Sequence, residues 1–540
     1  MLPPRHHLDH PYGSSRLASE DELRPLTRGR SPIVRLGNTV IRFPRGVPVY
    51  VQGGAGSGKY SNLGSRVLAD PANGSVFVLD IGGQYFSTSW HWNLALKREA
   101  YALNPFGCGA YPSINHPVNL WGILKDGPYL VDDAKRIARM GVTQTKAGGD
   151  NSWVGNEGVR WVKSLLIFLV LANGRATPAS FWHLLNAIRS DDEAFKTFTR
   201  RAQVMTYGVY ATLIEIYEKK HEAPREFGAV FGNLLDSFDW LSSPQVAASV
   251  SGDEDYLSDL TDPNRNVVIY FVIPGGSAKD NESLTRMAVG IAQLHCVRAN
   301  NGHTPLFYLE EAAVCGPAEF LLSAASEFRK YADTVFVYQS YGQPVANFGK
   351  AGAQTLIESC GLQVYLGGGV RDIDSAQRLA RTLGKTTISV NDPMVQARHA
   401  HQAEEAALDR LYRGDDPIRS LDRYDYERAQ SQRQRKMGRD LIDPAEMMSL
   451  KDQVLIVSPG SGVPPILADK LLPYWKSPAM AGRYGPDPAH ASDLTRVTIP
   501  RRLLGSTQRK FIRRPAPAHL AHWPNHISGE IAYVRGFRTW

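Results

Sequence analysis

The amino-acid sequence predicts an α/β protein with a mainly parallel sheet and an inserted all-helical domain. Short apolar runs of strand length recur along the chain, and several precede helix-like segments, an alternation typical of parallel strands with crossover helices. Between about Leu124 and Pro263 the pattern changes to longer periodic runs with few strand signals. This interval therefore indicates a helical insertion within the α/β domain.

Each predicted strand is a run of β-branched or aromatic apolar residues. In chain order the runs are 48–51, 75–80, 267–273, 306–309, 334–338, 362–366 and 454–457. Helix-like segments at 282–299 and 374–383 follow the third and the sixth run. The polar, charged stretch at 399–434 suits an exposed helix and linker before the last strand.

The composition is that of a globular protein. Of the 540 residues 43% are hydrophobic and 21% are charged, which excludes a chain that is disordered throughout. The four cysteines lie far apart, without the spacing of a zinc site or a disulfide framework, and this favours a reducing compartment. The longest strongly apolar stretch, 164–172, is about half of what a bilayer requires. We therefore expect a cytoplasmic protein.

A glycine-rich segment follows the first predicted strand and matches the pattern G-x-x-x-x-G-K of a phosphate-binding loop. Backbone N–H groups of such a loop bind phosphate oxygens at the positive end of the next helix, and its lysine reaches the terminal phosphates. Tyr60 stands where Ser or Thr usually places a hydroxyl on magnesium. The predicted nucleotide-binding residues are Gly53, Gly54, Ala55, Gly56, Ser57, Gly58, Lys59 and Tyr60.

Two adjacent carboxylates end the predicted strand 306–309. A nucleoside triphosphatase needs one carboxylate near magnesium and another that activates water, so we predict that Glu310 binds the metal and that Glu311 is the catalytic base. Adjacent strand residues face opposite ways, and the pair works only if the chain turns there. Gln339 ends the next strand, where its amide can contact the terminal phosphate or the attacking water.

The last part of the chain is strongly basic. The net charge of the whole chain is +8, and residues 494–540 alone carry nine Arg and Lys against one acid, with aromatic residues interleaved. Such a segment can bind phosphates and stack bases, or it can dock on an acidic protein. Both alternatives stay open from the sequence.

Taken in order, these features resemble the type IV secretion coupling proteins, the TraG-like conjugative DNA transfer ATPases. The resemblance covers most of residues 13–475. It is carried by the blocks 13–18 (GSSRLA), 78–85 (VLDIGGQY), 103–106 (LNPF), 328–331 (FRKY), 339–343, 348–350, 360–361, 366–367, 383–386 (LGKT), 438–446 (GRDLIDPAE), 454–457 (VLIV) and 464–466 (PPI). A chromosome-type DNA translocase shares the motor core but does not explain the block 438–466.

The resemblance implies a RecA-like P-loop motor that uses ATP and Mg²⁺ and assembles as a homo-hexamer. Its partners would be non-specific DNA, with a single strand as our expectation, relaxosome or secreted protein substrates, and components of a type IV secretion channel. Arg329, beside Lys330, matches the arginine finger that one subunit inserts into its neighbour's site.

The same resemblance divides the chain into four parts. Residues 1–124 hold the N-terminal segment and the first part of the nucleotide-binding domain, 125–263 the all-helical insertion, 264–475 the second part of the nucleotide-binding domain and 476–540 a basic C-terminal tail. The family's two N-terminal membrane helices have no counterpart in this sequence, so we expect membrane contact only through partners.

Three departures from the family pattern favour an alternative function. Tyr60 lacks the short hydroxyl, Gly82 replaces a lysine, and Glu310 replaces the usual Asp at the metal position. The alternative is a nucleotide-binding scaffold or substrate receptor without significant ATP turnover, whose helical domain recruits secretion substrates.

Overall fold

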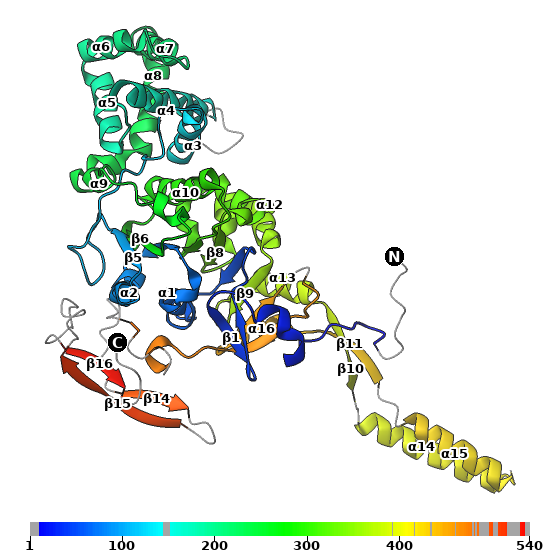
Figure 1. Ribbon diagram of the computed structural model, residues 1–540. Coiled ribbons are helices and arrows are strands. Elements are labelled where there is room, and N and C mark those ends of the chain that lie inside the picture. Colours follow the sequence, from blue (N-terminus) through cyan, green and yellow to red (C-terminus); the bar gives the residue numbers. More distant parts are fainter. Residues whose placement is uncertain are drawn as a thin grey trace.

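The computed structural model of the protein describes residues 10–143, 152–390, 393–414, 416–431, 435–458, 461–477, 480, 483–484, 496–500, 506–515 and 530–534. Within these residues an eleven-stranded sheet forms the centre of the fold (Figure 1). Its spatial order is β2 (Thr39–Arg42), β1 (Pro32–Leu36), β13 (Ile466–Lys470), β12 (Gln453–Val457), β9 (Leu362–Leu366), β3 (Val49–Gln52), β8 (Asp333–Tyr338), β7 (Leu306–Leu309), β4 (Val76–Ile81), β6 (Val267–Ile273) and β5 (Glu99–Leu103).

The strands from β9 to β5 run parallel, whereas β12, β13, β1 and β2 extend the sheet with antiparallel pairings. All seven predicted strand runs coincide with strands of this sheet, and the predicted fold class is confirmed. Four of its strands, β1, β2, β5 and β13, were not predicted. The sequence of β5, EAYAL, begins with a charge and holds two alanines, which are weak strand formers.

Helices cover both faces of the parallel part of the sheet, because alternate strand residues point to opposite sides. Val49 and Val78 face the core below α1 (Ser65–Ala69) and α2 (Gln84–Ala95). Tyr50 and Leu79 face the other core, below α10 (Glu282–Ala299), α11 (Glu319–Ser326), α12 (Gly342–Ser359) and α13 (Ile373–Leu383).

A helical domain is inserted between β5 and β6, as predicted, and stands above the sheet in Figure 1. Its helices are α3 (Leu130–Gly141), α4 (Ser152–Asn173), α5 (Pro178–Ser190), α6 (Asp192–Ala202), α7 (Val209–Glu222), α8 (Pro224–Ser237) and α9 (Pro244–Ser249). The apolar stretch within α4 is buried in its core from Leu165 to Val170. The division of the chain at 124, 263 and 475 stays a prediction.

Among the described residues no single helix is long and apolar enough to span a membrane. Helices α4 and α5 meet the criteria of length and composition only when taken together, as a pair bent by 110°.

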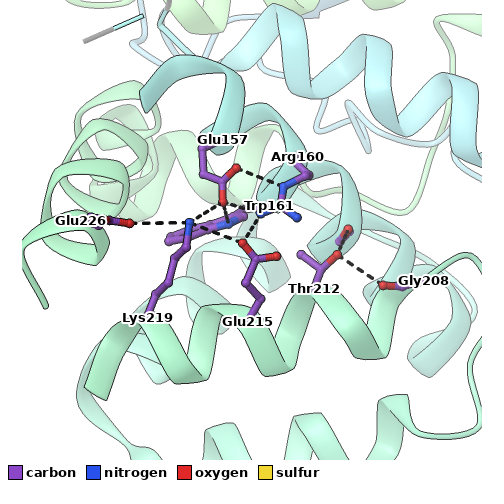
Figure 2. Close-up of polar contacts among 9 residues, drawn as sticks. Glu157, Arg160, Trp161, Gly208, Thr212, Glu215, Lys219 and Glu226 are labelled. Carbon is purple, nitrogen blue, oxygen red and sulfur yellow. Dashed lines mark hydrogen bonds and ion pairs between the residues drawn. The ribbon is translucent and has the colours of Figure 1, made fainter. Parts of the chain in front are cut away.

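A cluster of charges ties α4 to α7 inside the helical domain (Figure 2). Glu157 accepts hydrogen bonds from Trp161 Nε1 at 3.1 Å and from Lys219 Nζ at 2.9 Å, and Arg160 bridges Glu157 and Glu215. Burial alone would raise the pKa of the Glu157 carboxyl, but the hydrogen bonds from Arg160 and Lys219 lower it to about 2. The cluster therefore stays charged and holds the two helices in register.

A helical hairpin projects from the sheet on a two-stranded ribbon (Figure 1). The ribbon pairs β10 (Lys385–Val390) with β11 (Arg435–Asp440), and the hairpin consists of α14 (Pro393–Tyr412) and α15 (Pro417–Ser431). The predicted exposed helix at 399–434 is thus two helices, and their side chains include the exposed Met394, Tyr412 and Ile418.

The N-terminal block GSSRLA lies against the block LGKT, although the two are distant in sequence. Thr387 N donates to Gly13 O at 3.0 Å and Ser15 N donates to Lys385 O at 3.0 Å. Gly13 has a φ of 151°, and a Cβ there would lie 2.2 Å from Lys385 O. Only glycine fits this close approach.

The basic C-terminal part contains strands that the sequence analysis did not predict. In the region predicted as a tail, β14 (Arg496–Pro500), β15 (Ser506–Pro515) and β16 (Glu530–Val534) form an antiparallel sheet in which Arg496 pairs with Lys510 and Ile512 with Tyr533. Of the aromatic residues interleaved there, Trp523, Phe537 and Trp540 lie outside the described residues.

Candidate nucleotide-binding site

The phosphate loop leaves the carboxyl end of β3, a central strand between β8 and β9. Gly56 and Gly58 have φ angles of 75° and 92°, which a residue with a side chain rarely adopts. After Gly58 the chain enters a helical turn at Lys59–Gly64 that continues directly into α1. The predicted order of strand, glycine-rich turn and helix is therefore present, and its backbone N–H groups lie at the start of a helix.

Lys59 folds back onto this loop. Its Nζ donates to Gly53 O at 2.6 Å and to Gly54 O at 3.3 Å. Burial lowers the pKa of the Lys59 ammonium, while the nearby carboxylates of Glu310 and Glu311 raise it. The structure thus brings the predicted lysine and both predicted carboxylates together at one edge of the sheet.

The side chain of Tyr60 lies away from the loop. Its ring packs edge-on against Tyr85, with centroids 4.8 Å apart, and against Tyr474 at 5.6 Å, and its hydroxyl donates to Thr88. The phenol is therefore a core side chain rather than a metal ligand. The nucleotide contact predicted for Tyr60 stays a prediction for its backbone N–H.

Glu310 ends β7 beside a second carboxylate, that of Asp80 on β4. Burial raises the pKa of the Glu310 carboxyl well above its usual range, and the charge of Asp80 raises it further. Burial also raises the pKa of Asp80 to about 7, although backbone N–H groups at the start of α2 oppose this; Phe86 N donates to Asp80 Oδ2 at 2.7 Å. One oxygen of each carboxylate, Glu310 Oε2 and Asp80 Oδ1, is buried without a hydrogen-bond partner in the described structure.

These two oxygens are chemically suited to a divalent cation. Mg²⁺ in phosphate sites is usually held by one or two carboxylates together with phosphate oxygens and water. A cation beside Glu310 and Asp80 would favour the ionised form of both carboxylates. The residues present therefore fit this metal. Asp80 belongs to the block 78–85 that resembles the family, but it was not predicted as a site residue.

Glu311 sits at the sharp turn that the adjacent carboxylates require. Its backbone is left-handed, with φ 53° and ψ 53°, a conformation that is uncommon outside glycine, asparagine and aspartate. Gln339 Nε2, at the end of β8, donates to Glu311 Oε1 at 2.7 Å. The structure therefore places the predicted base and the predicted glutamine in direct contact.

Arg329 is not brought to this loop. It is exposed in the short helix Phe328–Lys330, just before β8 begins, whereas the phosphate loop follows the carboxyl end of β3. Because β3 and β8 are parallel, Arg329 lies at the opposite edge of the sheet. It cannot reach the site of its own subunit from there.

A further cation, which was not predicted, lies at the phosphate loop. Arg371, in the loop after β9, donates from Nη2 to Ala55 O at 2.7 Å. The signal for it in the sequence is an arginine two residues after the three glycines 367–369, at the end of a strand. That signal gains meaning only once β9 is known to lie beside β3.

A phosphate loop on a central parallel strand, with carboxylates at the same ends of two further parallel strands, β7 and β4, defines a RecA-like P-loop nucleotide-binding protein. The family model "Type IV secretory system Conjugative DNA transfer" matches residues 26–404. The chain belongs to this family, and the resemblance to the conjugative coupling proteins is confirmed.

Curated relatives include the type IV secretion system-coupling protein VirD4 of Bartonella henselae, which is 28% identical over 171 residues. They also include the conjugal transfer protein TraG of Rhizobium radiobacter, which is 30% identical over 173 residues. Each match covers 31% of this chain and 26% of the relative, so the aligned part spans about a quarter of the curated proteins.

Solved structures extend the likeness to most of the chain. The bacterial conjugative coupling protein TrwBdeltaN70, in complex with sulphate, has a TM-score of 0.57 at 16% identity and covers 85% of this chain and 95% of its own. The plasmid coupling protein TrwB in complex with ADP and Mg²⁺ has the same TM-score and identity and covers 84% of this chain and 93% of its own. These structures establish the shared fold.

Proposed function

We propose that this chain is an ATP-driven motor that moves DNA, or a nucleoprotein or protein substrate, toward a type IV secretion channel. The observation that carries the proposal is the convergence of Lys59, Gln339, Glu310 and Glu311 at the carboxyl ends of three neighbouring strands, β3, β8 and β7. The nucleotide complexes of the related TrwB fold, with ADP and Mg²⁺ and with an ATP analogue, support ATP and Mg²⁺ as its ligands.

In this proposal the loop amides and Lys59 bind the phosphate chain. The Lys59 ammonium exchanges its loop carbonyls for the β and γ phosphates and neutralises their charge. Glu310 and Asp80 would hold Mg²⁺, and a bound cation would neutralise negative charge on the phosphate chain.

Glu311 acts on the attacking water. Its carboxylate accepts the proton that the water loses, and Gln339 fixes the carboxylate through the 2.7 Å hydrogen bond and senses the γ phosphate. The backbone of Glu311 is left-handed and its carboxylate contacts Gln339, and in this proposal the two adjacent carboxylates serve different tasks.

Arg329 completes the site of a neighbouring subunit in a ring, for which we propose a homo-hexamer. Its exposed position at the far edge of the sheet supports this role, because a group supplied in trans must lie on the outside of its own subunit. An arginine finger contributes about 10³ to 10⁵ in rate.

Turnover should therefore depend on assembly and on DNA. We expect ATP hydrolysis per chain to rise with protein concentration and on addition of single-stranded DNA, as measured on purified protein whose oligomeric state is followed by light scattering. Equal activity per chain in dilute monomer, with no response to DNA, would contradict the motor.

Replacing the finger should remove turnover and spare nucleotide binding. Arg329→Ala should lower hydrolysis by roughly 10³-fold or more, with ATP affinity nearly unchanged. Arg329→Lys should rescue little, because lysine lacks the planar fork of donors. Lys330→Ala, next to it and also exposed, is the matched control and should stay close to wild type. If Lys330→Ala is the more damaging change, the assignment of Arg329 is wrong.

DNA contact is proposed for the basic C-terminal part as well. Arg509 and Lys510 on β15 are exposed, and Lys510 lies opposite Arg496 in the sheet. Adjacent cations of this kind bind phosphates without sequence preference.

The scaffold alternative is favoured by one specific observation, the burial of the Tyr60 phenol in the core. The hydroxyl that usually helps to hold magnesium is thereby absent from this loop position. In that alternative the chain binds nucleotide and recruits substrates through its helical domain, without significant turnover.

A further inference from the structure

Arg371 joins two loops at the candidate site. It follows β9, on the side of the phosphate loop opposite Gln339, since β9 and β8 flank β3. Its Nη2 donates to Ala55 O at 2.7 Å and its Nε donates to Gly368 O at 2.8 Å. The guanidinium is therefore fixed at the phosphate loop, while its side chain stays exposed.

The two loops are packed backbone against backbone, which fixes where this guanidinium lies. A Cβ at Gly369 would lie 2.6 Å from the Cα of Gly53, and a Cβ at Gly54 would lie 3.1 Å from Gly368 O. Neither position tolerates a side chain without a shift of the opposing loop. The position of Arg371 relative to the phosphate loop thus follows from the sheet itself.

Three successive carbonyls of the phosphate loop hold two cations. Lys59 binds those of Gly53 and Gly54, and Arg371 binds that of Ala55. Within the described part of the chain Arg371 forms no ion pair, and its two hydrogen bonds use two of the five N–H donors of a guanidinium. Because Arg371 has no carboxylate partner there, Lys59 and Arg371 together create a positive field at a loop whose amides bind phosphate.

We infer that Arg371 is a second nucleotide-binding cation, supplied by the same chain, which binds the phosphate chain of ATP while it braces the loop at Ala55. The inference rests on the proposed function, because it assumes that the loop binds a nucleoside triphosphate. Its planar fork suits phosphate oxygens as well as carbonyls. The site would then combine Arg371 in cis with Arg329 in trans.

Equilibrium binding of ATP, ADP and AMP to the full chain tests this, by competition with a fluorescent ATP analogue. Arg371→Gln removes the charge and keeps a hydrogen-bond donor. We expect ATP affinity to fall on the order of 10-fold or more, as for the loss of a hydrogen bond to a charged group. The loss should be smaller for ADP and smallest for AMP, and Arg371→Lys should recover part of it.

Arg381→Gln, an exposed arginine on α13, is the matched control and should bind all three nucleotides like the wild type. Unfolding temperatures of all variants verify that they are folded. An equal loss for ATP, ADP and AMP in Arg371→Gln would reduce Arg371 to a brace of the loop and overturn the inference. So would unchanged affinities.

The same measurement separates this inference from the proposed function. If wild type binds ATP, Lys59→Ala binds it more weakly, and Arg371→Gln binds it like wild type, then only the role of Arg371 is wrong. If wild type fails to bind ATP, both fail.

Discussion

Replacing Lys59 with alanine should abolish ATP hydrolysis and also weaken ATP binding. The ammonium is held 2.6 Å from Gly53 O at the phosphate loop, and it would contact phosphate in both the ground and the transition state. Without it, the phosphate charge faces the carboxylates of Glu310 and Glu311 uncompensated. We expect ATP affinity to fall on the order of 10- to 100-fold, as for lost charge-assisted hydrogen bonds, and turnover to fall below detection.

The measurement is ATP affinity and turnover on the assembled protein. Lys135→Ala, an exposed lysine on α3 of the helical domain, is the control and should change neither. Wild-type ATP affinity in Lys59→Ala would place the nucleotide somewhere other than this loop.

Replacing Glu311 with glutamine should separate binding from hydrolysis. The amide keeps the shape of the carboxylate and can still hydrogen-bond to Gln339, but it cannot accept a proton from water. We expect ATP binding to stay near wild type and turnover to fall by about 10² to 10⁴, the contribution of a general base. Glu319→Gln, exposed in the first turn of α11, is the control with the same chemical change.

This variant also distinguishes the motor from the scaffold. In the scaffold the wild type already lacks effective hydrolysis, because Tyr60 provides no hydroxyl for magnesium. Equal turnover of wild type and Glu311→Gln, in the assembled state with DNA present, would therefore leave only the scaffold.

The central part of the fold could be predicted from the sequence because its signals are local. Fully buried parallel strands such as Val267–Ile273 are continuous β-branched and aromatic runs, and the helical insertion has a different period. Three strands of the antiparallel extension, β1, β2 and β13, and the separate ribbon of β10 and β11 were not predicted. Strands β10 and β11 are KTTISV and RKMGRD, polar sequences that become strands only because they pair with each other and with the segment around Gly13.

Some residues of the candidate site could likewise be predicted from local signals, and others could not. Lys59 ends the short loop after β3 and Glu311 lies just after β7, and the carboxyl edge of parallel strands gathers such residues. The raised pKa of Asp80 depends on how tightly α2 and β7 enclose it, which no local pattern reports. Arg371 depends on which strand neighbours β3, and the order of strands in space is set by long-range pairing.

The pairing of β1 with β13 has a consequence for synthesis of the chain. Val34 lies opposite Lys470, so the hairpin β1–β2 joins the sheet only through one of its last strands to be made. At roughly 5 to 20 residues per second a ribosome needs roughly 20 to 90 seconds to reach β13. Throughout that interval the edge of β1 is open to mispairing, and a chain released early, before residue 466, would carry that open edge permanently.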